Sequence, residues 1–188
     1  MTDYFALLRQ CRQPHLDNSA VEQAFRERAR LLHPDANGAN EGEGFAQLNT
    51  AFKVLRDPHL RLRHLLELEN VVPAKELLAS ELLELFSRAA EISHQAKAEI
   101  ANERGLGSAI ARSVAQLRRS KICMQLLSVL EELEANQLLA QRDLEGLNEL
   151  WKKDQAAAVE KVTQLHQRFT VLQRWLAILR ELQFQLEN

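Results

Sequence analysis

Three consecutive residues, His33-Pro34-Asp35, have side chains that could support chemistry. A histidine and an aspartate can serve as a general base and its orienting group, but catalysis would also need a placed nucleophile or third partner, which the sequence does not offer. His33 could instead be a cation at the C-terminus of a helix, where the helix dipole favours positive charge. Proline fixes its own φ angle and restricts the preceding residue, so both side chains are expected to project outward in a preset geometry.

Two predicted helices hold this tripeptide in the loop between them. Helical periodicity runs over Ser19–Leu32 and again over Glu43–Arg56, and the stretch 33–42 is rich in Asn and Gly and can only form a loop. Ser19 and Glu22 have the spacing of a capping box, in which the two side chains satisfy free backbone amides at the helix start. The two helices therefore determine where the loop residues project.

Each of these helices carries an apolar stripe, formed by Val21, Phe25 and Leu32 on the first and by Phe45, Leu48, Phe52 and Leu55 on the second. Two such stripes joined by a loop predict an antiparallel helical hairpin. A short helix over Asp3–Gln10 and another after Pro58 are expected to flank it. Arg26 and Arg30 lie four residues apart on one face of the first helix, where they form either a local basic patch or a solvated surface.

The remainder of the chain predicts three longer helices, over Ala74–Glu103, Ser108–Ala135 and Asp143–Leu186. Apolar seams with three- and four-residue spacing follow the first and the last of them, at Leu78, Leu82, Leu85, Ile92 and Ala96 and at Leu165, Phe169, Leu172, Leu176 and Leu179. Such seams are typical of a three-helix antiparallel bundle. Because Val71-Val72-Pro73 interrupts the helical pattern, the predicted domains of this all-α protein are residues 1–70 and residues 71–188.

Composition and charge exclude several kinds of function. Apolar residues make up 46% of the 188 residues, as in a globular protein, and the net charge is −2. Residues 1–70 hold 9 basic and 10 acidic side chains and the rest hold 15 and 16, so neither part has the basic excess of a nucleic-acid-binding protein. The short run Arg118-Arg119-Ser120-Lys121 is expected to be a solvated turn of helix. With no apolar run of membrane length and no targeting segment, a cytoplasmic protein that binds no membrane is expected.

The residues that usually bind metals are scattered. Cys11 and Cys123 are solitary, and the chain has no CxxC pair. His64, His94 and His166 lack the spacing of metal ligands and are expected at the surface. The sequence therefore predicts no metal site and no cofactor.

Residues 3–68 resemble a J domain, the family of DnaJ-like co-chaperones. The tripeptide carries the resemblance together with residues at the spacing that the family uses, namely Asp3-Tyr4-Phe5, Leu7-Leu8, Ala24-Phe25-Arg26, Phe45, Leu48-Asn49, Ala51-Phe52, Leu55, Asp57-Pro58 and Arg61. Two segments, Leu48–Leu55 and Pro58–Leu68, are similar to the HscB-type branch of iron–sulfur cluster assembly. That branch joins an N-terminal J domain to a C-terminal three-helix bundle, which is also the architecture predicted here.

The resemblance implies a function without catalysis by this chain. The first hairpin helix and the loop would dock on a DnaK- or HscA-type ATPase chaperone near its interdomain linker, with Asp35 paired to an arginine of that partner. His33 and Pro34 would hold the shape of the loop, and Arg26 and Arg30 would face an acidic surface of the partner. Docking would bias the chaperone toward the state that hydrolyses ATP.

Two positions depart from the family pattern. Arg28 falls near the apolar stripe of its helix, where the family has an aliphatic residue, and its stem is expected to follow the core edge with the guanidinium in water. Asp35 is followed by Ala36-Asn37, where the family continues with lysine. Both departures leave the tripeptide intact.

The resemblance also implies a client. In HscB-type proteins an IscU-type scaffold protein binds the first helix of the C-terminal bundle, and Leu77, Glu81 and Glu84 are the candidate contacts here. Two other hypotheses remain open: a J-domain protein with a different client, and a helical scaffold or assembly module with weak J activity.

Overall fold

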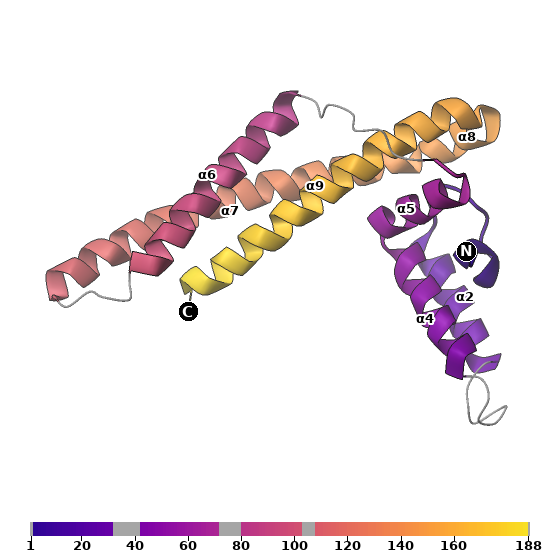
Figure 1. The fold of residues 1–188 in the computed structure, drawn as a ribbon, viewed down its shortest axis with the longest axis horizontal. Helices are drawn as coiled ribbons and strands as arrows, with labels where there is room; N and C mark the ends of the chain where they lie inside the picture. Colours follow the sequence, from indigo (N-terminus) through magenta and orange to yellow (C-terminus); the bar gives the residue numbers. More distant parts are fainter. Residues whose placement is uncertain (1, 32–41, 72–79, 103–107, 188) are drawn as a thin grey trace. The chain divides into compact units, whose positions relative to one another are not determined.

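The structure, a computed structural model, describes residues 2–31, 42–71, 80–102 and 108–187. Within these ranges every regular element is a helix, which confirms the predicted all-α fold (Figure 1). None of the described helices is both long and apolar enough to cross a membrane. The chain forms two compact units: unit 1 comprises Met1–Lys75 with Ala140–Phe169, and unit 2 comprises Glu76–Leu139 with Thr170–Asn188.

Unit 1 begins with the predicted hairpin and its flanking helices: α1 over Tyr4–Leu7, α2 over Asn18–Leu31, α4 over Gly42–Arg56 and α5 over Pro58–Leu68. The helices α2 and α4 pack side by side, as the stripes predicted. The first helix is shorter than expected because Arg9 adopts a left-handed backbone conformation, with φ at 51°.

The start of α2 differs from the predicted capping box. Asp17, not Ser19, occupies the position before the helix, and its Oδ1 accepts the Ser19 amide at 2.9 Å while its Oδ2 accepts the Ser19 hydroxyl at 2.8 Å. The Glu22 carboxylate lies instead 3.4 Å from Arg26 and 3.6 Å from Arg56. Aspartate is as good a cap as serine, and helix formation begins one residue earlier than predicted.

A buried apolar cluster joins the N-terminal helices; it consists of Phe5, Leu8, Leu16, Val21, Leu48, Ala51, Leu55 and Leu65. The predicted stripe residues Val21, Leu48 and Leu55 are 0% exposed. Phe25 and Phe52 pack against this cluster from α2 and α4, and their rings stack with centroids 4.4 Å apart. Offset aromatic pairs of this kind add to the stabilisation from burial alone. The hairpin is therefore held along its length by apolar contacts.

Arg61 is a buried charge in the middle of unit 1, with 2% of its surface exposed. Its Nε donates to the Pro14 carbonyl at 2.8 Å and its Nη1 donates to the Leu55 carbonyl at 2.6 Å. Burial lowers the pKa of the guanidinium to about 10, a shift that nearby Asp57 opposes, so the group stays charged at neutral pH. One side chain thus joins the segment before α2, the last turn of α4 and α5.

Backbone hydrogen bonds of Asn70 and Val71 end the helix α5. Asn70 has a positive φ of 55°, and its amide donates to the Glu67 carbonyl at 3.2 Å. The Val71 amide donates to the Leu66 carbonyl at 2.9 Å. These two bonds make a Schellman motif, in which asparagine often takes the left-handed position. The motif ends α5 immediately before the predicted domain boundary.

Unit 1 also contains α8, over Leu147–Lys153, with the ends of α7 and α9 that flank it. A second buried cluster joins α5 to these segments through Leu62, Leu66, Ala140, Leu144, Leu147, Val162, Leu165 and Phe169. Asn148 adds a contact with the segment before α2, since its Oδ1 accepts the His15 amide at 2.9 Å and its Nδ2 donates to the His15 carbonyl at 3.0 Å. The compact units are divided differently from the predicted domains, residues 1–70 and 71–188, and that domain division stays a prediction.

Unit 2 is built from α6 over Ser80–Asn102, the part of α7 (Ala109–Glu145) up to Leu139, and the part of α9 (Gln155–Glu187) from Thr170 (Figure 1). These three helices share one core. The described residues of the predicted seams are buried, namely Leu82, Leu85, Ile92, Ala96, Leu165, Phe169, Leu172, Leu176 and Leu179. Leu78 lies outside the described residues. The predicted seams therefore identified core faces of both helices.

Two predicted boundaries of the long helices were also wrong. The second long helix continues from Ala135 to Glu145, because Asn136 is accommodated by a side-chain bond from its Nδ2 to the Glu132 carbonyl at 3.0 Å. The third does not begin at Asp143; α8 comes first and ends at Lys153, because the backbone of Asp154 is not helical. The Asp154 Oδ1 then accepts the Ala157 amide at 3.1 Å and caps α9.

Replacing Arg61 tests whether its side chain holds together the segment before α2, the last turn of α4 and α5. Arg61→Met keeps the apolar stem but leaves the Pro14 and Leu55 carbonyls without their donors, and we expect a loss of about 2–4 kcal/mol in the free energy of unfolding. Arg63→Met is the matched control, because Arg63 is exposed and forms an exposed ion pair with Glu67 at 3.4 Å. Its expected cost is below about 0.5 kcal/mol. Equal losses in urea denaturation of the two variants would contradict the structural role given to Arg61.

Candidate functional site

The predicted docking surface lies on α2. Arg26 and Arg30 are both exposed on this helix, four residues apart as expected. Arg26 forms an ion pair with Glu22 at 3.4 Å, but 73% of its side chain remains exposed. An exposed pair at this spacing holds the side chain weakly. The tripeptide His33-Pro34-Asp35, which completes the predicted surface, lies outside the described residues.

Arg28 does not follow the expectation of a guanidinium free in water. Its Nε donates to the Leu7 carbonyl at 3.0 Å, and the residue is half-buried. That carbonyl belongs to the last residue of α1, where helical carbonyls have no partner within the helix. Arg28 therefore attaches α2 to the end of α1, while Arg26 and Arg30 stay exposed.

His64 is buried, with 3% of its surface exposed, so its expected place at the surface is wrong. Its Nε2 accepts the Tyr4 amide at 3.1 Å, and its ring lies 4.5 Å from the Tyr4 ring and 5.8 Å from the Phe5 ring. Burial lowers the pKa of His64, although the charges of Glu67 and Asp3 oppose the shift. The neutral imidazole thus satisfies a free amide of α1, and it does so from α5.

Asp3 completes the start of α1. Its Oδ1 accepts the amides of Phe5 at 3.0 Å and Ala6 at 3.2 Å, and its Oδ2 pairs with Arg12 at 2.6 Å. Burial raises the pKa of Asp3, but the bonds from Arg12, Ala6 and Phe5 outweigh burial and bring it below its ordinary value. The carboxylate is therefore ionised at neutral pH and caps the helix.

A pair of stacked histidines lies where α5 meets α9 inside unit 1. The rings of His59 and His166 are nearly parallel, at 7°, with centroids 4.9 Å apart. Burial, with smaller effects of His59 and Arg63, lowers the pKa of His166 to about 4. Burial also lowers the pKa of His59. Both rings are therefore largely neutral at neutral pH and can stack without charge repulsion. Of the three histidines expected at the surface, only His94 is exposed.

These histidines predict how stability changes with pH. His64, His59 and His166 bind protons less readily in the folded chain than in the unfolded chain, whose histidines titrate near pH 6.5. The unfolded chain therefore binds more protons below about pH 6.5, and the free energy of unfolding should fall from there toward about pH 4.

The variant His166→Phe keeps a ring beside His59 but removes one titrating group. Its free energy of unfolding, measured by urea denaturation between about pH 7 and about pH 5, should fall less steeply than that of the wild type. Parallel profiles for the two proteins would contradict the assignment of a neutral His166 to the folded state.

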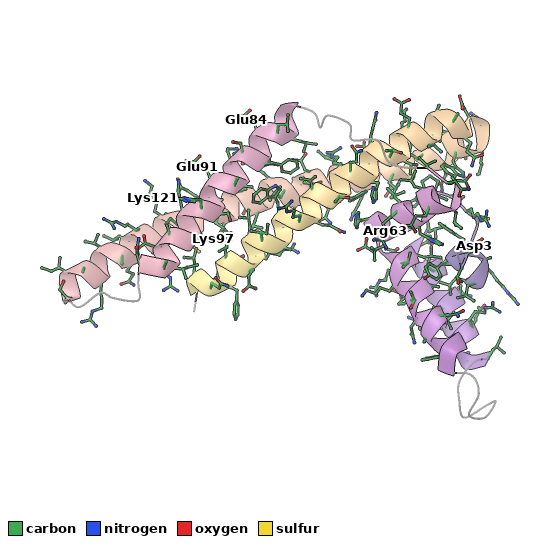
Figure 2. The ribbon with its side chains drawn as sticks, viewed as in Figure 1. Asp3, Arg63, Glu84, Glu91, Lys97 and Lys121 are labelled. Atoms are coloured by element: carbon green, nitrogen blue, oxygen red, sulfur yellow. The ribbon has the colours of Figure 1, made fainter. Side chains whose placement is uncertain are left out.

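The predicted client surface lies on α6 of unit 2. Glu84 is exposed and projects from this helix (Figure 2). Leu77 lies outside the described residues, and the Glu81 side chain is also not described. Leu83, which was not among the predicted contacts, is 50% exposed beside Glu84. Leu83 lies next to the core residue Leu82, so its exposure could be predicted from the sequence only after the buried face of α6 was known.

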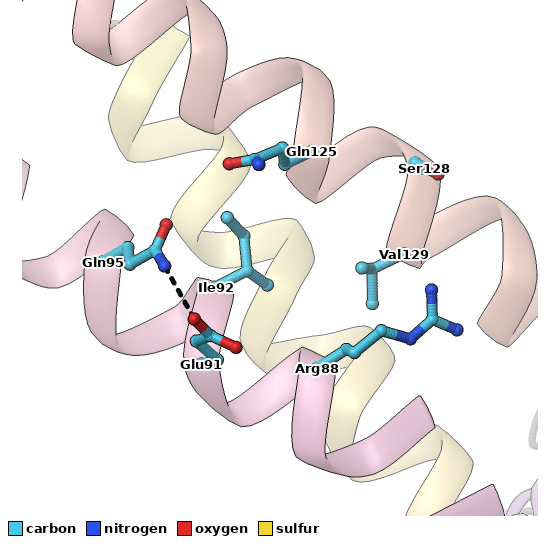
Figure 3. A pocket seen from close by; sticks show the side chains of 7 residues that line it. All are labelled: Arg88, Glu91, Ile92, Gln95, Gln125, Ser128 and Val129. Carbon is cyan, nitrogen blue, oxygen red and sulfur yellow. Dashed lines mark hydrogen bonds between the residues drawn. The ribbon is translucent and has the colours of Figure 1, made fainter. Parts of the chain in front are cut away.

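An ion pair and an open hollow mark the contact between α6 and α7. Arg88 pairs with Glu132 through both carboxylate oxygens, which raises the pKa of Arg88 and lowers that of Glu132. Next to this pair is a hollow of about 260 Å³ (Figure 3), lined by Arg88, Glu91, Ile92, Gln95, Gln125, Ser128 and Val129. Gln95 donates to Glu91 at 3.2 Å along its α6 edge. The described residues contain no cluster of three or more His, Cys, Asp or Glu that could hold a metal ion.

Comparisons with known proteins agree with this arrangement. Residues 3–64 match the family model of the DnaJ domain. The chain is 43% identical over 58 residues to chaperone protein DnaJ 2 of Streptomyces avermitilis, covering 30% of this chain and 15% of that protein. It is 40% identical over 62 residues to a tetratricopeptide repeat and J domain-containing co-chaperone of Cryptococcus neoformans, covering 33% and 11%. The chain thus spans a small part of the length of these curated relatives.

Two solved structures share the fold over nearly the whole chain. Chaperone HscB from Vibrio cholerae matches with a TM-score of 0.52 and 19% identity, over 99% of this chain and 96% of that one. Human co-chaperone protein HscB matches with a TM-score of 0.62 and 17% identity, over 96% and 82%. The chain therefore carries a DnaJ domain at residues 3–64 and has, over its length, the fold of the HscB co-chaperones.

Proposed function

We propose that this protein is a co-chaperone that stimulates ATP hydrolysis by a DnaK- or HscA-type chaperone and delivers an IscU-type iron–sulfur scaffold protein to it. The observation that carries the proposal is the DnaJ domain match over residues 3–64, which includes His33-Pro34-Asp35. The fold shared with HscB proteins supports the choice of branch. In this proposal residues 1–70 dock on the chaperone, residues 71–188 bind the client, and the protein works in the cytoplasm.

The chaperone would bind along α2 and the tripeptide. Arg26 and Arg30 are exposed there, while Arg28 is turned to the Leu7 carbonyl. Two arginines on one face attract an acidic surface and increase the rate of encounter more than the final affinity. Asp35 would then pair with an arginine of the chaperone, and the tripeptide would give the complex its specificity.

The co-chaperone itself makes and breaks no bond in this mechanism. A chaperone that exists in two conformations is shifted toward the one to which the J domain binds more tightly. The shift is limited by the difference in affinity for the two states. The protein therefore contributes a rigid surface, held by the hairpin core and by the contacts of Arg61 and His64.

Charge reversal on α2 tests the docking surface. The double variant Arg26→Glu/Arg30→Glu should reduce stimulation of single-turnover ATP hydrolysis about fivefold at subsaturating co-chaperone and low salt. The loss should shrink as salt rises, because screening weakens attraction between exposed charges. Arg174→Glu, at an exposed position of α9 in unit 2, is the control and should behave as the wild type. An equal effect of the control, or no effect at any salt concentration, would contradict docking along α2.

The client would bind the exposed face of α6. Leu83 and Glu84 are adjacent and exposed on this helix, and the predicted contacts Leu77 and Glu81 precede them along the chain. An apolar side chain beside carboxylates suits a partner surface of apolar and basic character. The face is separate from the buried side of α6, where Leu82 and Leu85 pack into the core.

A substitution at Glu84 tests this face. Glu84→Lys should weaken binding of an IscU-type scaffold protein about fivefold in titration calorimetry, because it places like charges opposite each other. Glu160→Lys, at an exposed position of α9 in unit 1, gives the matched control and should bind as the wild type. Binding that is unchanged by Glu84→Lys would favour a different client, with the J activity retained.

A further inference from the structure

The helix α7 has a second apolar face in addition to the one that enters the core. Leu126, Val129 and Leu130 of this helix are buried against α6 and α9. Most of the large apolar side chains that remain exposed in the described residues nevertheless lie on the same helix: Ile110 (78%), Val114 (42%), Leu117 (72%), Met124 (65%), Leu127 (40%), Leu138 (50%) and Leu139 (48%). Exposed apolar surface of this extent is typical of an interaction site.

Five of these seven residues, all except Leu127 and Leu139, fall on a regular seam. Positions recur at alternating spacings of four and three along α7: Ile110, Val114, Leu117, Lys121, Met124, Ser128, Glu131, Ala135 and Leu138. This is the spacing at which one helix packs against another in a coiled coil. From Val114 to Leu138 the seam is about 36 Å long at 1.5 Å per residue. The seam therefore suits a partner helix more than a compact ligand.

The charged residues of the seam indicate what kind of partner helix would bind there. Its two charged members are Lys121 toward one end and Glu131 toward the other, and both are exposed (Figure 2 shows Lys121). Glu132 and Glu134 are used within unit 2, where they pair with Arg88 and with Arg180 at 2.7 Å. Among the described residues, neither Lys121 nor Glu131 takes part in an ion pair of this kind. Both charges are thus available to a partner.

We propose that this seam binds the same seam of a second copy of the chain, in antiparallel orientation. The twofold axis would pass near Leu126, so Lys121 of each copy lies opposite Glu131 of the other. Leu117 then faces Ala135 of the second copy, Val114 faces Leu138, and Met124 faces Ser128. A parallel pair in the same register would place Lys121 against Lys121 and Glu131 against Glu131, which is unfavourable.

This arrangement pairs every seam residue from Val114 to Leu138 with an apolar, small or oppositely charged residue. One helix from each copy contributes, so the interface is modest in area and the dimer should depend on protein concentration. The seam shares no residue with the docking face on α2 or with Leu83 and Glu84 on α6. Dimerisation would therefore present two J domains and two client surfaces in one assembly.

The test is the oligomeric state of the full-length protein over micromolar to near-millimolar concentrations, by sedimentation equilibrium. The wild type should dimerise, and Lys121→Glu or Glu131→Lys alone should each lower the association constant at least about tenfold, since each places like charges together twice. The double variant K121E/E131K exchanges the charges and should restore dimerisation. Lys97→Glu, at an exposed position of α6, is the control and should leave the dimer unchanged.

Three results would overturn the proposal. A wild-type protein that stays monomeric at the highest concentration would exclude a second copy as the occupant. A dimer that survives both single reversals would lie on another surface. Failure of the double variant to recover, with circular dichroism showing that it is folded, would contradict the antiparallel pairing of Lys121 with Glu131.

Discussion

The buried guanidinium of Arg61 is the interaction on which the geometry of unit 1 depends. A charge in an apolar interior needs hydrogen-bond partners, and here the carbonyls of Pro14 and Leu55 accept hydrogen bonds from Nε and Nη1 of Arg61. Pro14 lies just before α2 and Leu55 lies in the last turn of α4. Because one side chain fixes both points relative to α5, the two helices of the hairpin are held at their ends as well as along their stripes.

Other contacts extend this fixed geometry toward the surface of α2. His64 accepts the Tyr4 amide from α5, and Arg28 donates from α2 to the Leu7 carbonyl, so α1 is attached at both ends. Asn148 holds the His15 backbone from α8. A rigid surface of this kind suits a protein that acts by selecting one state of a partner.

The sequence predicted the regular parts of the fold well, and it missed features that depend on distant partners. Helical spacing and loop composition located α2, α4 and the core seams, because these signals are local. The continuation of α7 past Asn136 was missed, since a polar residue inside a helix shows its bond to the preceding turn only in the structure. The packing of α8 and the flanking residues 140–169 with the N-terminal helices was missed for the same reason: contacts such as that of Asn148 with His15 join positions far apart in the chain.

For the candidate site residues, too, local features were predicted and contacts between distant positions were missed. The spacing of Arg26 and Arg30 was sufficient to place them on one face, where both are exposed. His64 was expected at the surface because nothing near it in the sequence shows that its ring would accept the Tyr4 amide, 60 residues away. The exposed seam of α7 has a helical spacing that can be read from the sequence, but the buried face of α7 has the same spacing. The sequence alone therefore does not show which face is buried. The burial of Leu126, Val129 and Leu130 in the structure distinguishes the two faces.

The most direct test of the co-chaperone role is single-turnover ATP hydrolysis by DnaK- and HscA-type chaperones of the same organism, with the full-length protein and with its His33→Gln variant. The wild-type protein should accelerate hydrolysis by at least one of these chaperones, and the variant should leave the basal rate unchanged although its circular dichroism matches the wild type. A wild-type protein that accelerates neither chaperone, or a variant that accelerates as well as the wild type, would contradict the proposed function.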